Sequence, residues 1–402
     1  MNQSNNSSTS STSSTSFNNL SENVEVEEIK NFVEMNLRED VFRGITSYGW
    51  DDPTPIQQKA IVPINTGKDV IVQAEAGQGK TGAFVIGALE CIDLTLNEPQ
   101  VLILSPTKEL TEQSYRITNE LGQHMENLVV HMCCGGTSRR EDSINLREGG
   151  HIVCGTPGKI RDLIERSILK IGSIKQFILD EADVLLSKGF KDDIYNIFKY
   201  LPENIQSIIV SATIPPECLE MTNKFMREPI RILKKSQDLS LDNISQFLIV
   251  VDHNNYKNEV ISDLYQCLSI QSAMIFCNTR ATATSLEQFL KNSDHSVSVC
   301  HSDLSKDERK KVLDEYRAGE TRVLISTDLL GRGIDIQHVS LVINYELPLK
   351  IDDYIHRIGR SGRYGRKGTA INLVTERDMV DIKAIEKKFS TEIKEFEVGY
   401  EL

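Results

Sequence analysis

Ten short apolar runs recur along this 402-residue chain, and they constrain its fold more than any other feature. Five lie in the first half, within DVIVQA, QVLILSP, GHIVCGTP, KQFILDEAD and SIIVSAT. Five lie in the second half, within SAMIFCNTR, SVSVCHSD, TRVLISTD, VSLVINYELP and GTAINLVTE. Amphipathic helical stretches separate them, and short apolar strands between helices are typical of a parallel sheet buried on both faces. The sequence therefore predicts two α/β domains of related design.

Polar segments predict the domain boundaries. Residues 1–28 begin with a Ser, Thr and Asn run that holds almost no apolar side chain, so we expect a disordered tail. Residues 234–243, KKSQDLSLDN, are polar enough for a linker. The two domains are then residues 29–233 and 244–402, each long enough to bury its own core.

Charge, cysteines and hydropathy exclude several classes of protein. A formal net charge of −13 argues against a generally basic nucleic-acid coat, so any contact with RNA or DNA has to come from local basic surface. The eight cysteines show no zinc-site spacing. No apolar stretch approaches the ~18 residues of a membrane span, and no signal peptide is recognisable. We expect a soluble protein of the cytoplasm or nucleus without membrane contact.

Residues 70–84, VIVQAEAGQGKTGAF, join an apolar run to a turn that ends in Gly79-Lys80-Thr81. In a phosphate-binding loop, backbone N–H groups surround the phosphates, a lysine reaches the outer ones and a hydroxyl joins the Mg²⁺ shell. Lys80 and Thr81 fit those roles, although Ala74 stands where the usual motif has its first glycine. An ordinary glycine-rich turn is the alternative.

An acidic motif strengthens the nucleotide interpretation. In FILDEAD, residues 177–183, Asp180 and Glu181 directly follow an apolar run. One carboxylate there can hold Mg²⁺ and the other can orient the attacking water. An acidic helix start favoured by the helix dipole is the alternative for this motif alone. Together with the phosphate loop, the two carboxylates predict hydrolysis of ATP or GTP.

The full set of motifs resembles one family. Residues 30–402 carry, in order, GWDDPTPIQ, AEAGQGKT, PTKEL, Gly135-Gly136, TPGK, DEAD, Ser211-Ala212-Thr213, STDLLGRGID and HRIGRSGR. This set resembles the DEAD-box RNA helicases, which are named for the tetrapeptide at residues 180–183. The resemblance implies a superfamily 2 helicase of the P-loop NTPase class, with two RecA-like domains built on parallel sheets. It implies an enzyme that binds single-stranded RNA and opens short duplexes as it hydrolyses ATP.

The resemblance assigns nucleotide-binding roles. Phe32 matches an aromatic that stacks on adenine and Gln57 matches the glutamine that reads adenine, so ATP is expected rather than GTP. Without the resemblance, a core residue is the favoured interpretation of Phe32. Asp335 matches a ribose contact, and Thr81 and Asp180 are the expected Mg²⁺ ligands. The phosphate loop and the catalytic carboxylates are matched by Ala76, Gly77, Gln78, Gly79, Lys80, Thr81, Asp180 and Glu181.

Further matches link the two domains. Arg360 and Arg363 match paired arginines that reach the γ-phosphate across the cleft, where a planar cation stabilises transition-state charge. The basic segment around them is alternatively an exposed, solubilising loop. Residues that couple hydrolysis to strand separation are matched by Asp183, Ser211, Thr213, His356 and Arg357.

RNA-contacting motifs of the family have counterparts in both halves. Phosphate and 2′-hydroxyl contacts give such proteins affinity without sequence choice. Taken singly, each motif is as consistent with an ordinary turn or helix cap, and only their order favours RNA. The matching positions are Pro106, Thr107, Lys108, Gly135, Gly136, Thr156, Pro157, Gly158, Arg280 and Thr327.

Segments between the motifs are most similar to the translation-initiation branch of the family, with the exon junction branch second. The resemblance implies a cytoplasmic monomer within a larger complex, acting on single-stranded and structured mRNA with a HEAT-repeat scaffold of the initiation factor 4G type. The alternative is a nuclear, ATP-gated RNA clamp of the exon junction type. A DNA-directed motor and an inactive structural protein are further alternatives.

Six positions depart from the family pattern, and one of them is Gly331, which replaces an alanine before Arg332 at a hinge-like position. Ala76 and Gln78 stand beside the phosphates where serine and threonine are usual, and Trp50 replaces a phenylalanine in the adenine-side motif. Lys108 and Lys159 replace arginines, which keeps the charge but loses the bidentate guanidinium fork. None of these changes removes a required catalytic group, but they bear on affinity for ATP and RNA.

Overall fold

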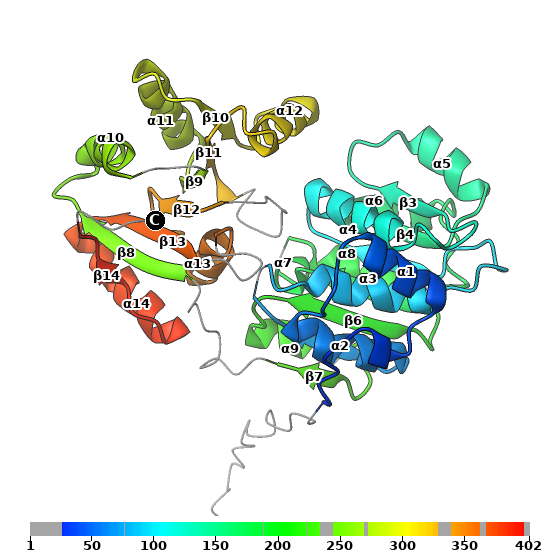
Figure 1. The fold of residues 1–402 in the computed structure, drawn as a ribbon. Coiled ribbons are helices and arrows are strands. Elements are labelled where there is room, and N and C mark those ends of the chain that lie inside the picture. Colours follow the sequence, from blue (N-terminus) through cyan, green and yellow to red (C-terminus); the bar gives the residue numbers. More distant parts are fainter. Residues whose placement is uncertain are drawn as a thin grey trace, which may run out of the picture.

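The computed structural model shows two α/β lobes (Figure 1). The predicted linker, nearly all of the predicted tail, and the predicted site residues Ala76, Asp335 and Arg363 lie outside the described residues. The predicted domain boundaries stay predictions. The structure describes residues 26–75, 77–187, 189–222, 224–233, 244–268, 272–328, 339–361 and 367–397.

Parallel strands form the sheet of each lobe. The first lobe has β1 Val70–Gln73, β2 Val101–Leu104, β3 Val130–Cys133, β4 Ile152–Gly155, β5 Gln176–Asp180, β6 Gln206–Ser211 and β7 Ile230–Ile232. The second lobe has β8 Ile244–Val250, β9 Ala273–Phe276, β10 Val297–Cys300, β11 Val323–Ser326, β12 Leu341–Asn344, β13 Gly368–Val374 and β14 Lys394–Glu395.

The two sheets have the same topology. Within the described residues, the spatial order is β3-β4-β2-β5-β6-β1-β7 in the first sheet and β10-β11-β9-β12-β13-β8-β14 in the second. Counted from the first strand of each lobe, the two orders are identical. This confirms the predicted α/β fold with two parallel sheets of related design.

Helices pack on both faces of the sheets (Figure 1). The first lobe has η1 Val33–Met35, α1 Glu39–Ser47, α2 Pro55–Asn65, α3 Lys80–Glu90, α4 Lys108–Leu121, α5 Arg139–Arg147, α6 Pro157–Glu165, α7 Ala182–Leu185, α8 Lys191–Tyr200 and α9 Pro216–Thr222. The second lobe has η2 Asn254–Tyr256, α10 Lys257–Cys267, α11 Arg280–Asn292, α12 Lys306–Arg317, α13 Ile351–Ile358, η4 Glu376–Asp378 and α14 Met379–Phe389. Strand side chains alternate between the faces, so Val70 and Val72 join one hydrophobic cluster while Ile71 joins another.

All ten apolar runs form strands, but four further strands carry no such run. β7 and β14 are short edge strands, and β3 is an edge strand whose two middle residues are only half-buried. β8 lies between β13 and β14 but includes the polar residues Ser245 and Gln246. An apolar run marks a strand that is covered on both faces, whereas each of these strands is partly exposed.

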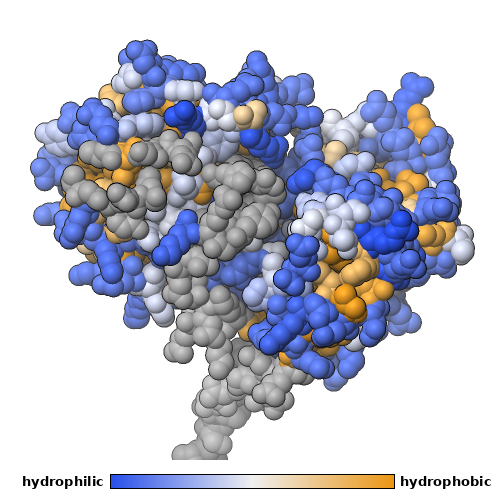
Figure 2. Space-filling model, viewed as in Figure 1, coloured by the Kyte–Doolittle hydropathy of each residue, from blue (hydrophilic) through white to orange (hydrophobic). Residues whose placement is uncertain are grey.

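On the face shown in Figure 2, hydrophilic side chains cover most of both lobes. Among the described helices, none is both long and apolar enough for a bilayer crossing. Seven cysteines within the described ranges are free, and burial raises the pKa of the Cys133 and Cys277 thiols to about 12. These cysteines therefore act as packing side chains.

Close packing of α1 on α4 depends on Gly44. A Cβ at this position would overlap the backbone carbonyl of Leu121, which cannot rotate away. We expect Gly44→Ala to lower the free energy of unfolding by about 1–3 kcal/mol, the usual cost of overpacking. Urea denaturation measures the change, with Gly172→Ala as the control because a Cβ at Gly172 meets nothing within 4 Å. Equal stability of the two variants would contradict this packing.

Candidate nucleotide site and RNA-facing edge

The nucleotide motifs meet at one edge of the first sheet. The phosphate loop follows β1, Asp180 ends β5 and Ser211 ends β6. These three strands are neighbours in the order β5-β6-β1, and all of them run parallel. Their carboxyl ends therefore bring together residues that are far apart in the sequence, as open α/β sheets do at their ligand sites.

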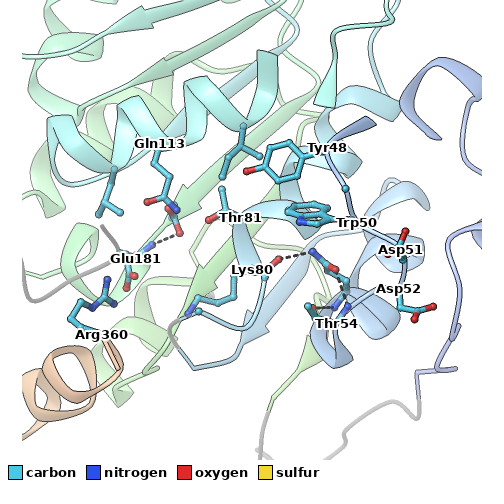
Figure 3. A pocket seen from close by; sticks show the side chains of 18 residues that line it. Tyr48, Trp50, Asp51, Asp52, Thr54, Lys80, Thr81, Gln113, Glu181 and Arg360 are labelled. Atoms are coloured by element: carbon cyan, nitrogen blue, oxygen red, sulfur yellow. Dashed lines mark hydrogen bonds between the residues drawn. The ribbon is translucent and has the colours of Figure 1, made fainter. Parts of the chain in front are cut away.

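A pocket of about 340 Å³ lies at this edge, a volume within the usual range of small-molecule sites. Figure 3 shows Tyr48 and Trp50 at one end of it and Glu181 and Arg360 at the other, with Lys80 between them. The aromatic end suits a base and the charged end suits phosphates. The pocket is lined by Tyr48, Gly49, Trp50, Asp51, Asp52, Thr54, Gln57, Gly77, Gly79, Lys80, Thr81, Gly82, Leu110, Gln113, Ile117, Asp180, Glu181 and Arg360.

The phosphate loop is held by its own lysine. Lys80 Nζ donates hydrogen bonds to the carbonyl oxygens of Ala74 at 2.6 Å and Glu75 at 2.9 Å. Burial lowers the pKa of Lys80, and the nearby Glu181 carboxylate opposes this change. Gln78, one of the departures from the family pattern, donates through Nε2 to Glu75 Oε2 at 2.8 Å. Both residues belong to the loop, so this hydrogen bond stabilises the conformation of the loop itself.

Gln57 connects the start of α2 to the phosphate loop. The Thr54 N–H donates to Gln57 Oε1 at 2.9 Å and the Gln57 N–H donates to Thr54 Oγ1 at 3.4 Å, which forms a capping box. Gln57 Nε2 also donates to the Gly79 carbonyl at 3.2 Å. A glutamine amide has two N–H groups and two carbonyl lone pairs, so one of each is left to read a base.

Two buried carboxylates lie at the charged end of the pocket. Asp180 and Glu181 are 5% and 3% exposed, and burial, followed by the Glu181 charge, raises the pKa of Asp180 to about 7. Glu181 adopts a left-handed backbone with φ of 51° as it caps α7. Its Oε2 atom is buried, makes no hydrogen bond within the described part of the chain and lies 4.0 Å from His356 Nδ1. The pair therefore has unused capacity to bind a cation or a water molecule.

The second lobe contributes Arg360 to the pocket. Arg360 follows α13, is 1% exposed and donates through Nε to the His356 carbonyl at 3.1 Å. Its predicted partner Arg363 lies outside the described residues. A separate contact joins α12 to α4, where Arg309 Nη1 lies 3.2 Å from Glu109 Oε1.

Asp183 connects three of the predicted coupling residues. Its N–H donates to Ser211 Oγ at 3.3 Å, and the Thr213 hydroxyl donates to its Oδ2 atom at 2.7 Å. His356 Nε2, from the second lobe, lies 3.3 Å from the same oxygen. Ligand atoms of Glu181, Asp183 and His356 also lie within 4.8 Å of one another, close enough to hold a metal ion. Asp183 is therefore a direct link between β6 of the first lobe and α13 of the second.

Arg357, the other predicted coupling residue, points into the second lobe. It is fully buried and donates through Nε to Asp328 Oδ1 at 2.5 Å and through Nη2 to Asn278 Oδ1 at 2.8 Å. It also donates to the Glu346 carbonyl at 2.7 Å. These acceptors follow β11, β9 and β12, so Arg357 fixes the carboxyl ends of three strands. Its coupling role stays a prediction.

The RNA motifs of the first lobe follow the neighbouring strands β3, β4 and β2. The Gly135 N–H donates to Thr156 Oγ1 at 3.2 Å, which joins the Gly-Gly loop to the TPGK turn. Lys159 Nζ lies 2.6 Å from Asp142 Oδ2, and both side chains are mostly buried. A buried ion pair of this kind holds Lys159 inside the lobe. The pairing with Asp142 is therefore a sufficient reason for a positive charge at position 159, and no RNA contact is needed to explain it. The remaining positions lie in the same turns and at the starts of α4 and α6: Pro106, Thr107, Lys108, Gly136, Pro157 and Gly158.

Arg280 and Thr327 lie at the corresponding edge of the second lobe. Arg280 begins α11 after β9, and Thr327 directly follows β11, the neighbour of β9. The Arg280 guanidinium is exposed and pairs with Asp303. The structure thus brings the two positions to one strand edge, and their contact with RNA stays a prediction.

Phe32 lies in the core rather than in the pocket. Its side chain is 2% exposed and packs in the hydrophobic cluster that includes residues of α1 to α4. The aromatic residues that line the pocket are Tyr48 and Trp50. Stacking of adenine on Phe32 stays a prediction.

The pocket also contains residues that no sequence motif indicates. Gln113 and Ile117 line it from α4, together with Leu110, which ends the PTKEL motif. Their three- and four-residue spacing places them on one face of that helix, which is the signal that could have identified them. Tyr48 carries no comparable signal, because its position depends on how α1 ends.

Comparisons with known proteins agree with this architecture. Residues 54–222 match the family described as DEAD/DEAH box helicase, and residues 256–365 match the helicase conserved C-terminal domain. The chain is 50% identical over 367 residues to the ATP-dependent RNA helicase eIF4A of Kluyveromyces lactis, across 91% of this chain and 92% of that protein. It is 49% identical over 369 residues to the protein of the same name from Neurospora crassa, across 92% and 93%.

A solved structure supports the same conclusion. S. cerevisiae Dbp5 bound to RNA and ADP BeF3 has a TM-score of 0.86 and 32% identity, across 92% of this chain and 96% of that chain. The fold, the order of the motifs and the relatives agree along almost the whole length. The chain belongs to the DEAD/DEAH box helicase family.

Proposed function

We propose that this chain is an ATP-dependent RNA helicase of translation initiation. The observation that carries the proposal is the pocket between the lobes, where Lys80 and Glu181 of the first lobe lie with Arg360 of the second. A site completed by both lobes makes hydrolysis depend on their closure. The role in initiation is supported by the relatives named eIF4A, about half identical to this chain, and neither relative reported above bears an exon junction name.

ATP fits the pocket in one orientation. The triphosphate belongs at the loop of Gly77, Gly79, Lys80 and Thr81, because backbone N–H groups and the Lys80 ammonium favour anions. The base then reaches the aromatic end, where Gln57 offers one donor and one acceptor. Binding would draw Lys80 away from the carbonyl oxygens that it now contacts.

The residues present fit a Mg²⁺ ion at the charged end. Asp180 and Glu181 are adjacent buried carboxylates, and Glu181 Oε2 accepts no hydrogen bond from any described residue. Oxygen ligands of this kind suit a hard cation, and Thr81 and Asp180 would hold it. When bound, the ion would neutralise charge on the transferred phosphate. Glu181 is then placed to orient the attacking water and accept its proton.

Arg360 and Arg363 would complete the site from the second lobe. A guanidinium beside the γ-phosphate stabilises the charge that develops in the transition state. Asp183 supports this geometry, because its contact with His356 Nε2 holds α13 close to the carboxylates. We assign Ser211, Thr213 and His356 to this coupling.

RNA would bind across the exposed turns of both lobes. The turns after β2, β3 and β4 lie side by side in the first lobe, and those after β9 and β11 do so in the second. Each turn presents backbone N–H groups or short polar side chains, which contact phosphates without reading bases. Gly136, whose φ of 95° favours glycine, lets the chain turn sharply in one of them. Single-stranded and structured mRNA is the proposed substrate.

We further propose a cytoplasmic monomer that works within an initiation complex on a HEAT-repeat scaffold of the factor 4G type. This proposal is supported by the eIF4A relatives and by the family match.

The catalytic carboxylate is tested by Glu181→Gln. This change keeps the size of the side chain but removes the proton acceptor, so we expect RNA-stimulated ATP turnover to fall by about 100-fold or more. ATP binding should change by less than about threefold. Steady-state hydrolysis and calorimetry measure the two effects, with Glu126→Gln at an exposed position as the control. Retained turnover would refute the assigned site.

The link between the lobes is tested by Asp183→Asn. Asp183 accepts through Oδ2 from Thr213 and through Oδ1 from the Val184 N–H, whereas an asparagine has only one acceptor oxygen, so the closed arrangement loses support. We expect the gain in RNA affinity caused by a non-hydrolysable ATP analogue to fall about tenfold, a typical coupling energy. Fluorescence anisotropy of labelled RNA measures it, and Asp192→Asn on exposed α8 is the matched control. An unchanged gain would exclude this contact as the link.

A further inference from the structure

Trp50 is the only tryptophan of the chain, and its side chain lines the aromatic end of the nucleotide pocket (Figure 3). Its backbone is fixed by the way α1 ends. The Gly49 N–H donates to the Thr46 carbonyl at 3.0 Å and the Trp50 N–H donates to the Ile45 carbonyl at 3.2 Å, which is a Schellman motif. Gly49 has the left-handed φ of 86° that this motif requires. The backbone atoms from which the indole extends therefore have a fixed position.

Two neighbours orient the indole. The ring of Tyr48 contacts it edge to face, with 4.8 Å between centroids and an interplanar angle of 67°. The indole also lies against Gly82, the third residue of α3. A Cβ at Gly82 would lie 2.5 Å from Cη2 and 2.7 Å from Cζ3 of Trp50. The far edge of the indole thus lies directly against the helix backbone.

The side-chain amide of Gln57 also lies in the space left by the missing side chain at Gly82. A Cβ at Gly82 would also lie 2.5 Å from Gln57 Nε2, the atom that donates to the Gly79 carbonyl. Glycine is a poor residue inside a helix, so its presence here needs a packing reason. Apart from its own helix backbone and chain neighbours, the three atoms nearest to that Cβ belong to Trp50 and Gln57. A side chain at position 82 would therefore press first on the base end of the pocket, where Trp50 and Gln57 lie.

We propose that Trp50 and Gly82 are a matched pair that sets the width of the base subsite and holds the adenine-reading amide of Gln57 in place. This inference rests on the proposed function and concerns the same pocket. The indole supplies a flat wall for the purine base of a nucleoside triphosphate, and the missing side chain at Gly82 gives the indole room to lie there. Both residues determine specificity, and neither touches the transferred phosphate.

The single tryptophan gives a direct readout in the wild-type protein. We expect ATP and ADP to change its fluorescence at saturation, because the base contacts the indole. Inorganic tripolyphosphate, which has the phosphates but no base, should bind without a comparable change. A fluorescence change of equal size with tripolyphosphate, or no change with bound ATP, would overturn the proposal while leaving the proposed helicase function intact.

Calorimetry of variants tests the pairing. Gly82→Ala should weaken ATP binding about tenfold, which corresponds to 1.4 kcal/mol, and should leave tripolyphosphate binding within about twofold. Adding Trp50→Phe, which removes Cη2 and Cζ3, should restore most of the ATP affinity of Gly82→Ala. Gly172→Ala, at an open position, should bind ATP as the wild type does. A double variant no better than Gly82→Ala would refute the pairing.

A further variant distinguishes a failure of this inference from a failure of the proposed function. Trp50→Leu alone, which removes the aromatic wall, should stay folded and reduce the preference for ATP over GTP, which a merely structural tryptophan would not do. An unchanged preference would count against the proposal even if Gly82→Ala failed to fold. If the wild type bound none of ATP, GTP and tripolyphosphate, both the proposed function and this inference would be wrong.

Discussion

The parallel direction of every strand in the two sheets is the constraint on which the rest of the structure depends. Parallel strands place all their carboxyl ends at one edge, so the residues that follow β1, β5 and β6 meet although they are far apart in sequence. The same geometry places the turns after β2, β3 and β4 side by side. Because the second sheet repeats the strand order, its own edge carries Arg280, Thr327 and Asp328.

The contact between the lobes turns these two edges into one site. Asp183 accepts a hydrogen bond from Thr213 and lies beside His356, and all three side chains are largely shielded from water. In such an environment a hydrogen bond to a carboxylate is stronger than it is in water. Arg357 holds α13 against the second sheet through its hydrogen bonds. Because Arg360 follows α13 in the chain, a shift of this helix moves Arg360 relative to the phosphate loop. In the proposed mechanism, these contacts would connect chemistry at one edge to the position of the other lobe.

The sequence is sufficient for the features that rest on local pattern, and insufficient for those that rest on packing. Apolar runs predict the strands that are covered on both faces, but β7 and β14 are too short and exposed to give that signal. Lys80 and Glu181 are predicted because their motifs follow strands directly. The pairing of Trp50 with Gly82 depends instead on how α1 ends against α3, which no local pattern encodes.

Steady-state ATP hydrolysis, with and without saturating single-stranded RNA and with single-stranded DNA of the same sequence as the control, is the most direct test of a site completed by both lobes. If RNA holds the lobes together through 2′-hydroxyl as well as phosphate contacts, RNA stimulates turnover and DNA does not. Equal stimulation by both would contradict an RNA-directed enzyme. Equal turnover with and without RNA would contradict the claim that lobe closure on RNA completes the site.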